Sequence, residues 1–336
     1  MKFANFLRCL FLSVGIVILI FWREQELNFY KTVIFIHQQK FDEYFKEQQN
    51  PTCPGLNESD WEIYKDLTTP NIPIVLAEER LKLTWKDMGL VTFTSKTHMR
   101  EAIANCASIR AHPQLSSLPF TVFFSNDINE THSVQYQKEC PHAKTEMFPF
   151  EQFPDSVKRL DHYRFKAIHH SMAFKNHKIL LSFDSSILFN KNANFSDLIE
   201  SSIKGNPTDV SLLTPANHNM FSTTHPKMYD CFPNIKPEYM LKVPQFQSGL
   251  ILWIGSEMGW KAMKRFVECS LQPTCISPPG ATIKCNIQRI YKNQRVFSGC
   301  HRFDQAAINL ILYENSNHKP ELYQRRSPWF KVSRKP

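Results

Sequence analysis

The sequence predicts an α/β fold, a mostly parallel sheet flanked by helices, behind an N-terminal transmembrane helix. Short apolar runs alternate along the chain with segments of helical periodicity. Such alternation requires crossover connections, which make neighbouring strands parallel. One run, Ile179–Phe183, is nearly continuously apolar and ends on Asp184, as expected of a buried central strand. The third observation is the apolar character of the first residues of the chain.

Residues 1–22 are interpreted as a cytoplasmic tail and signal-anchor helix. The uncharged part runs from Cys9 to Trp22, which suits a tilted helix in a thin bilayer. Lys2 and Arg8 precede it, whereas Arg23 is followed closely by two glutamates, so the positive-inside rule places the remaining chain in the lumen. A cleaved signal peptide is the alternative, but the segment ends in large apolar residues and offers no small-residue cleavage site.

The rest of the chain divides into a stem, one domain and a tail. Residues 23–69 form a polar stem with one possible helix, Phe29–Gln48. Residues 70–318 are enough for one large α/β domain with a sizeable core. Residues 319–336 hold six basic side chains against one acidic one, and predict a solvated basic tail or a partly ordered lid.

Within the domain, strands and helices are expected in alternation. The expected strands are Leu90–Thr94, Phe120–Phe124, Ile179–Asp184, Ser211–Leu213 and Gly249–Ile254. The expected helices are Thr97–His112, Asp155–Lys175, Ser196–Lys204 with Ser196 as its cap, and Asp304–Tyr313.

Two features support a lumenal body. Acceptor sequons for N-glycosylation begin at Asn57, Asn129 and Asn194. Beyond the anchor lies an even set of cysteines, as expected in an oxidising compartment. These disulfide candidates are Cys53, Cys106, Cys140, Cys231, Cys269, Cys275, Cys285 and Cys300. The last four predict a locally closed, loop-rich insertion; a zinc site is the alternative, although no Cys-x-x-Cys pair occurs.

Several function classes have no support in the sequence. The chain contains no Gly-x-Gly-x-x-Gly, no Gly-x4-Gly-Lys and no Gly-x-Ser-x-Gly, which argues against Rossmann dinucleotide binding, P-loop chemistry and serine hydrolysis. The net charge of +9 fits an anionic partner such as a nucleotide-sugar, an acidic membrane or a glycan. No nucleic-acid partner is predicted.

The first candidate site residue is Asp184. In open α/β sheets, ligands bind just beyond the carboxyl ends of the strands. A lone carboxylate there is costly to bury unless a metal, a base or a sugar hydroxyl pairs with it. Ser185 and Ser186 add hydroxyls directly after it. The alternative is an aspartate that caps a turn.

Two later motifs add further candidates. Gln247-Ser248-Gly249 places an amide, a hydroxyl and a flexible backbone at the predicted start of a strand. Asp304 and Gln305 open a predicted helix, whose free N–H groups suit sugar hydroxyls or phosphate. For Asp304 the alternative is a plain N-cap.

Taken in order, these motifs resemble the GT-A glycosyltransferases of the glycogenin and galactosyltransferase type. There the pattern is Asp-x-Asp, then Asn-Ser/Ala-Gly, then Asp-Gln-x-x-x-Asn. The chain is also similar to a largely uncharacterised animal family expanded in nematodes, with a nucleotide-diphospho-sugar transferase-like fold. That resemblance covers about residues 90–312 and lies in YRFKA at 163–167, SFDSSILF at 182–189, the spacing of Cys269, Cys275 and Cys285 around a Pro-Pro-Gly, and CHRFDQ at 300–305.

The resemblance implies a GT-A-like domain that moves a sugar from a nucleotide-sugar donor to a lumenal glycan or glycoprotein acceptor. It implies a single-pass type II protein of the Golgi or ER membrane. Asp304 and Gln305 would then be catalytic. The donor would be bound by Asp184, Ser186, Lys166, Ser248 and Gly249, with Lys166 contacting the phosphate.

One departure from the family pattern concerns the metal. The Asp-x-Asp pair, which holds Mn²⁺ or Mg²⁺ on the diphosphate, is here Asp184-Ser185-Ser186. Asp184, a serine hydroxyl and a later histidine could still hold the ion, the candidates being His218, His225 and His301. Otherwise the enzyme would be metal-independent, with lysine and arginine neutralising the leaving phosphate. Two non-enzymatic alternatives stay open: an inactive lumenal binding protein on the same scaffold, and a secreted, disulfide-stabilised interaction protein.

Overall fold

The computed structural model describes residue 24, residue 53 and residues 55–205, 208–285 and 294–333. The chain divides into two units, Met1–Pro51 and Thr52–Pro336, and the description below concerns the second. The predicted signal anchor and the predicted stem helix Phe29–Gln48 lie outside the described residues, apart from Glu24. Within the described ranges, no helix is long and apolar enough to cross a bilayer.

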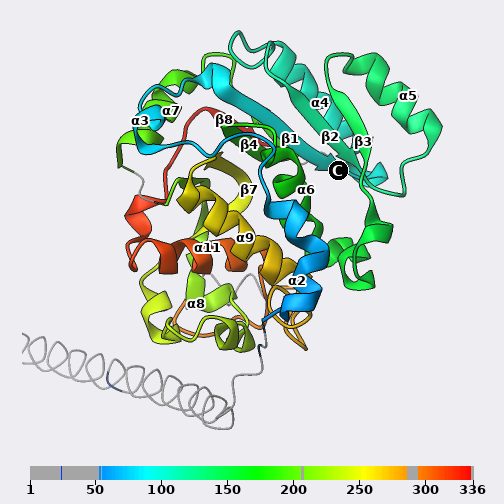
Figure 1. Cartoon of the computed structure of the whole chain (residues 1–336). Helices are drawn as coiled ribbons and strands as arrows, with labels where there is room; N and C mark the ends of the chain where they lie inside the picture. Colours follow the sequence, from blue (N-terminus) through cyan, green and yellow to red (C-terminus); the bar gives the residue numbers. More distant parts are fainter. Residues whose placement is uncertain (1–23, 25–52, 54, 206–207, 286–293, 334–336) are drawn as a thin grey trace, which may run out of the picture. The chain divides into compact units, whose positions relative to one another are not determined.

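A six-stranded sheet forms the centre of this unit (Figure 1). β1 pairs in parallel with β2 and β4, and β2 pairs in parallel with β3, whereas β7 runs antiparallel to both β4 and β6. The prediction of a mostly parallel sheet is therefore confirmed, with β7 reversed. In sheet order the strands are β3 (Lys144–Met147), β2 (Phe120–Phe124), β1 (Met88–Thr94), β4 (Ile179–Asp184), β7 (Pro244–Ile254) and β6 (Val210–Asn219).

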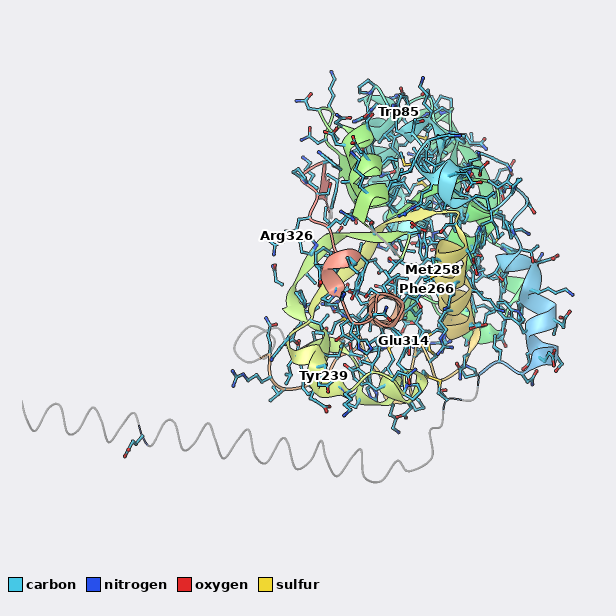
Figure 2. The ribbon with its side chains drawn as sticks, turned by 60° about the vertical axis from the view of Figure 1, so that its left-hand side comes forward. Trp85, Tyr239, Met258, Phe266, Glu314 and Arg326 are labelled. Carbon is cyan, nitrogen blue, oxygen red and sulfur yellow. A yellow bond between two sulfur atoms is a disulfide. The ribbon has the colours of Figure 1, made fainter. Side chains whose placement is uncertain are left out.

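Helices cover both faces of the sheet. On one face, Leu181 and Phe183 of β4 share an apolar cluster with α4 and α7. On the other face, α6 packs on β1 and β4, and α11 packs on β7 and α9. Figure 2 shows α11 end-on beside α9, the helix that carries Met258 and Phe266. The helices are α2 (Glu58–Tyr64), α3 (Ala77–Arg80), α4 (Met99–Arg110), α5 (Glu130–Glu139), α6 (Phe165–Phe174), α7 (Phe195–Gly205), α8 (Met220–Thr223), α9 (Glu257–Leu271) and α11 (Phe303–Asn315).

Burial on both faces explains why the central strands are so apolar. Successive side chains of a strand point to opposite faces, so a strand covered on both sides needs apolar residues throughout. Leu180 and Leu181 are both fully buried, on opposite faces of β4. Two buried polar groups of the sheet are paired with each other: Trp253 Nε1 of β7 donates to Ser182 Oγ of β4 at 3.1 Å.

The C-terminal segment is ordered on the domain up to residue 333. β8 (Phe330–Val332) pairs antiparallel with β5 (Ile187–Phe189), the short strand that follows Asp184. Upstream, Tyr323 is fully buried and Gln324 forms a bridge with Leu212 of β6. Of the two predictions for residues 319–336, these contacts favour the partly ordered segment over the solvated tail.

Some predicted element boundaries were wrong. The helix expected over Asp155–Lys175 begins only at Phe165, because Tyr163 adopts a left-handed backbone conformation with φ 55°. Two short 3-10 turns take its first part, Asp155–Lys158 and Leu160–His162. The helix expected at Ser196 begins one residue earlier, and Asn194 supplies the capping oxygen to the Ser196 N–H at 3.1 Å.

The strand expected at Gly249–Ile254 begins at Pro244, so Gln247-Ser248-Gly249 lies inside β7 and not at its start. The strand expected at Ser211–Leu213 is the first part of the longer β6. Both errors have one cause, because polar residues interrupt the apolar run, at Gln247 and Ser248 in β7 and at residues 217–219 in β6.

The second half of the predicted stem packs on the domain. Cys53 is bonded to Cys231, and Ser171 Oγ of α6 donates to the carbonyl of Leu67. The ammonium of Lys264 in α9 lies 4.9 Å from the ring centre of Trp61 in α2. The division at residues 51 and 52 therefore lies earlier than the predicted stem boundary at residue 69.

The eight cysteines that follow Cys9 in the sequence form four disulfides. They are Cys53–Cys231, Cys106–Cys140, Cys269–Cys275 and Cys285–Cys300. The last two close short local loops, as the spacing of these four cysteines predicts. Among the described residues, the close groups of three metal-ligand types contain sulfurs of these bonds, and a disulfide sulfur is not a thiolate ligand. The zinc alternative therefore has no support.

Candidate active site

Asp184 lies at the carboxyl end of β4, in register with Phe93 of β1. The chain adds β2 and β3 on one side of β1 and β4 on the other, so the sheet order reverses between β1 and β4. Such a switch point is where open α/β sheets bind ligands. The Asp184 side chain is 37% exposed, so it is accessible to a bound molecule.

Lys166 joins Asp184 to Asp304. Its ammonium nitrogen lies 2.7 Å from Asp184 Oδ1 and 3.0 Å from Asp304 Oδ2. Lys166 is in the first turn of α6 and Asp304 in the first turn of α11. Two carboxylates far apart in the sequence therefore contact one buried nitrogen.

The charge of Lys166 is stabilised by this arrangement. Burial by itself lowers the pKa of the Lys166 ammonium, but the carboxylates of Asp184 and Asp304 outweigh burial and hold that pKa above its ordinary value. The aromatic ring of Tyr163 adds a cation–π contact, with its centre 5.1 Å from the Lys166 nitrogen. The lysine is therefore a fixed positive charge between two acids.

Two consecutive residues of β7 contact the two carboxylates. Ser248 Oγ donates to Asp304 Oδ2. At Gly249, a Cβ atom would lie only 2.8 Å from Asp184 Oδ2, so any side chain there would displace the carboxylate. Glycine is needed at position 249 because the Asp184 side chain lies so close to the backbone there.

The conformation around Tyr163 fixes the position of Lys166. A left-handed backbone at a tyrosine is costly and persists only where the surroundings hold it. The next residue, Arg164, is buried and donates to the carbonyls of Ser270, Gln272 and Pro273 at 2.6, 2.8 and 2.7 Å. The start of α6 is therefore tied to the end of α9, next to the Cys269–Cys275 disulfide.

Gln305 faces a network inside the protein. Its side-chain nitrogen donates to Gln245 Oε1 at 2.7 Å, and Thr223 Oγ1 donates to the same oxygen at 2.8 Å. The amide nitrogen of Gln245 is buried without a hydrogen-bond partner. Asn309 holds the backbone of Phe246 at both its N–H and its carbonyl, at 3.2 and 2.7 Å. Gln245 and Thr223 were not found by sequence reasoning, because no motif or period marks them.

The three histidines proposed to complete a metal site do not do so. His301 is buried and both ring nitrogens meet backbone groups, the N–H of His225 and the carbonyl of Ile276, each at 3.1 Å. Burial lowers its pKa to about 3. His225 accepts from the N–H of Lys227 at 3.3 Å, and His218 Nδ1 lies 3.1 Å from Thr223 Oγ1. In the described part of the chain, no close group of three metal-ligand side chains includes Asp184.

The donor set at this site does not fit a divalent cation held by the protein alone. Asp184 is one carboxylate, and Ser186, in the place of the second, is buried. Asp304 is occupied by Lys166 and Ser248. Mn²⁺ and Mg²⁺ prefer several oxygen ligands, and these side chains do not supply them.

The sequon asparagines are all exposed and stand at helix starts. The side-chain oxygens of Asn57, Asn129 and Asn194 accept hydrogen bonds from the backbone N–H groups of Asp60, His132 and Ser196, respectively. This capping uses the side-chain oxygen, whereas an N-glycan is attached to the side-chain nitrogen. Capping and glycosylation are therefore compatible at each position.

No known family model matches the chain, and no curated protein matches it in sequence. Solved structures of sugar transferases are similar to it in three dimensions. The mannosyltransferase Ktr4p from S. cerevisiae in complex with GDP shows 10% identity and a TM-score of 0.43 over 81% of this chain and 80% of its own. Mouse xyloside xylosyltransferase 1 shows 12% identity and a TM-score of 0.42 over 71% of this chain and 84% of its own.

A third similar structure is core-mannan synthase A from Aspergillus fumigatus in its Mn/GDP form. It shows 11% identity and a TM-score of 0.38, over 61% of this chain and 73% of its own. All three TM-scores are below 0.5. The residues of the candidate site form a carboxylate–ammonium–carboxylate cluster, Asp184–Lys166–Asp304, at the switch point of an α/β sheet.

Proposed function

We propose that this protein is a glycosyltransferase of the GT-A type that moves a sugar from a nucleotide-sugar donor to a glycan or protein acceptor. The single observation that carries the proposal is the contact of Asp184 and Asp304 with Lys166. These three residues come from three different motifs of the set that resembles GT-A enzymes. They meet at the carboxyl ends of the parallel strands, where a donor would bind.

In the proposed reaction the bond from the anomeric carbon to the diphosphate breaks, and an acceptor oxygen forms the new bond to that carbon. The acceptor hydroxyl loses its proton, and the nucleoside diphosphate leaves. Asp184, at the strand end, would accept hydrogen bonds from the donor ribose. Asp304, held by Ser248, would hold the donor sugar from the start of α11, and Gln305 would fix the wall behind it.

For Lys166 we propose a role other than the direct phosphate contact expected from the sequence. Its side chain is 8% exposed, and its ammonium contacts two carboxylates. It would hold both acids in place and partly offset their negative charge as the diphosphate arrives. The positive charge for the leaving group then comes from a basic side chain or from a cation that enters with the donor.

We further propose a type II membrane protein of the Golgi or ER with a lumenal body. The charge asymmetry around residues 1–22 supports this orientation. Four disulfides and three exposed sequons fit an oxidising, glycosylating compartment.

A second candidate function is an inactive lumenal binding protein on the same scaffold. One observation favours it: Ser186 stands where the second metal-binding carboxylate would be, and Lys166 already occupies the remaining acids.

A donor screen separates the two functions. The full chain in detergent is incubated with each common nucleotide-sugar, with Mn²⁺ or with a chelator, and release of the nucleotide is measured. Release with one donor that is abolished in Asp304→Asn supports the transferase. Saturable donor binding without release in any condition, by the folded protein, supports the binding protein and overturns the transferase.

A further inference from the structure

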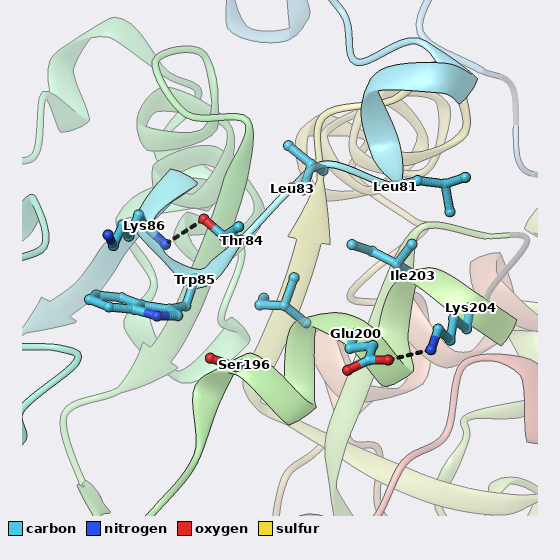
Figure 3. Close-up of a pocket in the computed structure, with 10 residues that line it drawn as sticks. Leu81, Leu83, Thr84, Trp85, Lys86, Ser196, Glu200, Ile203 and Lys204 are labelled. Atoms are coloured by element: carbon cyan, nitrogen blue, oxygen red, sulfur yellow. Dashed lines mark hydrogen bonds and ion pairs between the residues drawn. The ribbon is translucent and has the colours of Figure 1, made fainter.

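A second candidate site lies at the amino ends of the parallel strands, whereas Asp184 lies at their carboxyl ends. It is a pocket of about 430 Å³ between the segment before β1 and helix α7 (Figure 3). The pocket adjoins the amino end of β1, whereas Asp184 ends β4, which runs parallel to β1. The pocket is therefore separate from the candidate active site. It is lined by Leu81, Leu83, Thr84, Trp85, Lys86, Ser196, Ile199, Glu200, Ile203 and Lys204.

The lining combines an apolar floor with a polar rim. Leu83, Ile199 and Ile203 are buried, and the indole of Trp85 is half-buried beside them. The rim carries a hydroxyl from Ser196 and an ion pair between Glu200 and Lys204, seen as a dashed line in Figure 3. Pyranose rings present apolar C–H faces and polar edges, so an indole with an apolar floor and a hydrogen-bonding rim suits a sugar.

An acceptor sequon for N-glycosylation lies beside this pocket. Ser196, which lines the pocket, is the third residue of the sequon that begins at Asn194. Two residues of chain span at most about 7 Å, so a glycan on Asn194 begins at the rim. Asn194 is exposed, and its side-chain oxygen is held by the Ser196 N–H, which leaves its nitrogen for the glycan. No residue of the sequons at Asn57 and Asn129 lines this pocket.

We propose that this pocket binds the inner N-acetylglucosamine residues of an N-glycan attached to Asn194 of the same chain. A ligand tethered this closely has an effective concentration in the millimolar range, so weak contacts with Trp85 and the rim are sufficient. The bound sugar covers Leu81, which is 75% exposed, and fastens the segment before β1 to α7. The proposal depends on the lumenal orientation proposed above, but not on sugar transfer.

The test uses the full glycosylated chain and compares two sequons in one molecule. A peptide N-glycosidase is added to the native protein, and glycan loss at Asn194 and Asn129 is followed by mass spectrometry of the peptides. We expect release at Asn194 to be about ten-fold slower or more than at Asn129, and equal rates after unfolding. Equal rates in the native protein, or an unmodified Asn194, overturn the proposal.

Two variants show whether the pocket causes the protection. Leu81→Gln changes an exposed residue of the pocket and should speed release at Asn194, as should Trp85→Ala. Val134→Gln changes another exposed apolar residue, on α5 near Asn129, and as the matched control should leave both rates unchanged. Unchanged protection in both pocket variants contradicts the proposal.

A last measurement excludes a free glycan as the occupant. Chitobiose should bind Asn194→Gln but not the glycosylated chain, because the tethered sugar already fills the pocket. Equal binding of chitobiose to both proteins would make the pocket a site for an external sugar and overturn the proposal. Nucleotide release from the donor should be unaffected by Leu81→Gln, so failure here is distinguishable from failure of the proposed transferase.

Discussion

Lys166 is buried between two acids, and each member of this cluster depends on the others. Removing the lysine leaves Asp184 and Asp304 facing each other without a counter-charge. Removing one acid leaves the lysine paired with the other. Substitutions in this cluster should therefore separate effects on chemistry from effects on folding.

Asp184→Asn and Asp304→Asn should each reduce turnover by about 10²-fold or more, because each removes a charge that would act on the donor. Both proteins should still fold, since Lys166 keeps one carboxylate partner in each. The measurement is nucleotide release under saturating donor, beside a thermal unfolding curve. Full activity in either variant would contradict its assigned role.

Lys166→Met should lower the free energy of unfolding by about 3 kcal/mol, because it leaves the buried Asp304 carboxylate next to Asp184 without a counter-charge. In a chain that also carries Asp304→Asn, the same lysine change should cost clearly less. Denaturant unfolding of the two single variants and the double variant gives the coupling. Additive effects would show that Lys166 and Asp304 do not act together.

Gly249→Ala should reduce activity strongly with a small loss of stability. The added Cβ would lie 2.8 Å from Asp184 Oδ2 and move that carboxylate away from Lys166. Gly55→Ala is the matched control, since a Cβ there meets nothing within 4 Å. The comparison uses nucleotide release and unfolding for both variants, and equal activity in the two would disprove the steric argument.

Sequence reasoning identified Asp184, Lys166, Ser248, Gly249 and Asp304, and the structure brings these five residues together. They could be found because short motifs carry them, at the start of α6 and α11, at the end of β4 and within β7. Their roles were harder to infer. The sequence did not show that Lys166 would be enclosed by the acids, since that depends on how α6 and α11 meet.

At the scale of elements, apolar runs and helical periodicity predicted the central strands β1, β2 and β4 well. The pattern did not show that β7 is antiparallel, because a buried strand is equally apolar in either direction. Strand direction is decided by tertiary contacts, and a single sequence does not contain it in a local pattern. Helix α9 was also not predicted, although Ser256 caps it and buried residues such as Met263 and Phe266 recur at helical spacing.

The disulfide Cys285–Cys300 lies just before α11 and should hold the start of that helix. Replacing both cysteines by serine should cost about 3 kcal/mol for a loop with a sequence separation of 15, and should loosen the residues around Asp304. Hydrogen exchange should rise first in residues 294–306. The pair Cys106–Cys140, on α4 and after α5, is the control, and its removal should leave exchange at Asp304 unchanged.

At the scale of the whole molecule, buried neutral histidines should make the protein sensitive to acid. Burial lowers the pKa of His169 and His301 to about 3, and that of His170 well below its ordinary value. Between pH 6.5 and about 3 the unfolded chain therefore binds protons that the folded chain does not. Stability should fall as the pH falls through this window, by up to about 1.4 kcal/mol per pH unit for each such histidine.

His170→Phe tests this directly, because His170 lies among aromatic rings, 6.1 Å from Trp253 and 6.4 Å from Phe266. Between pH 6.5 and 4, the unfolding free energy of the variant should fall less steeply with falling pH than that of the parent. The difference in slope should correspond to about one proton fewer taken up on unfolding. Denaturant unfolding at several pH values gives the slope. An unchanged slope would mean that His170 does not contribute.

The Cys53–Cys231 disulfide can form only late in the synthesis of this protein. Its two cysteines are separated by 178 residues, whereas Cys106 and Cys140 are separated by 34. At roughly 5–20 residues per second, a ribosome needs about 10–40 s to deliver the partner of Cys53, but only about 2–7 s for that of Cys106. During this delay the Cys53 thiol is open to attack, and Cys106 and Cys140 are the nearest wrong partners to emerge. Cells that make this chain in quantity should therefore depend on a disulfide isomerase.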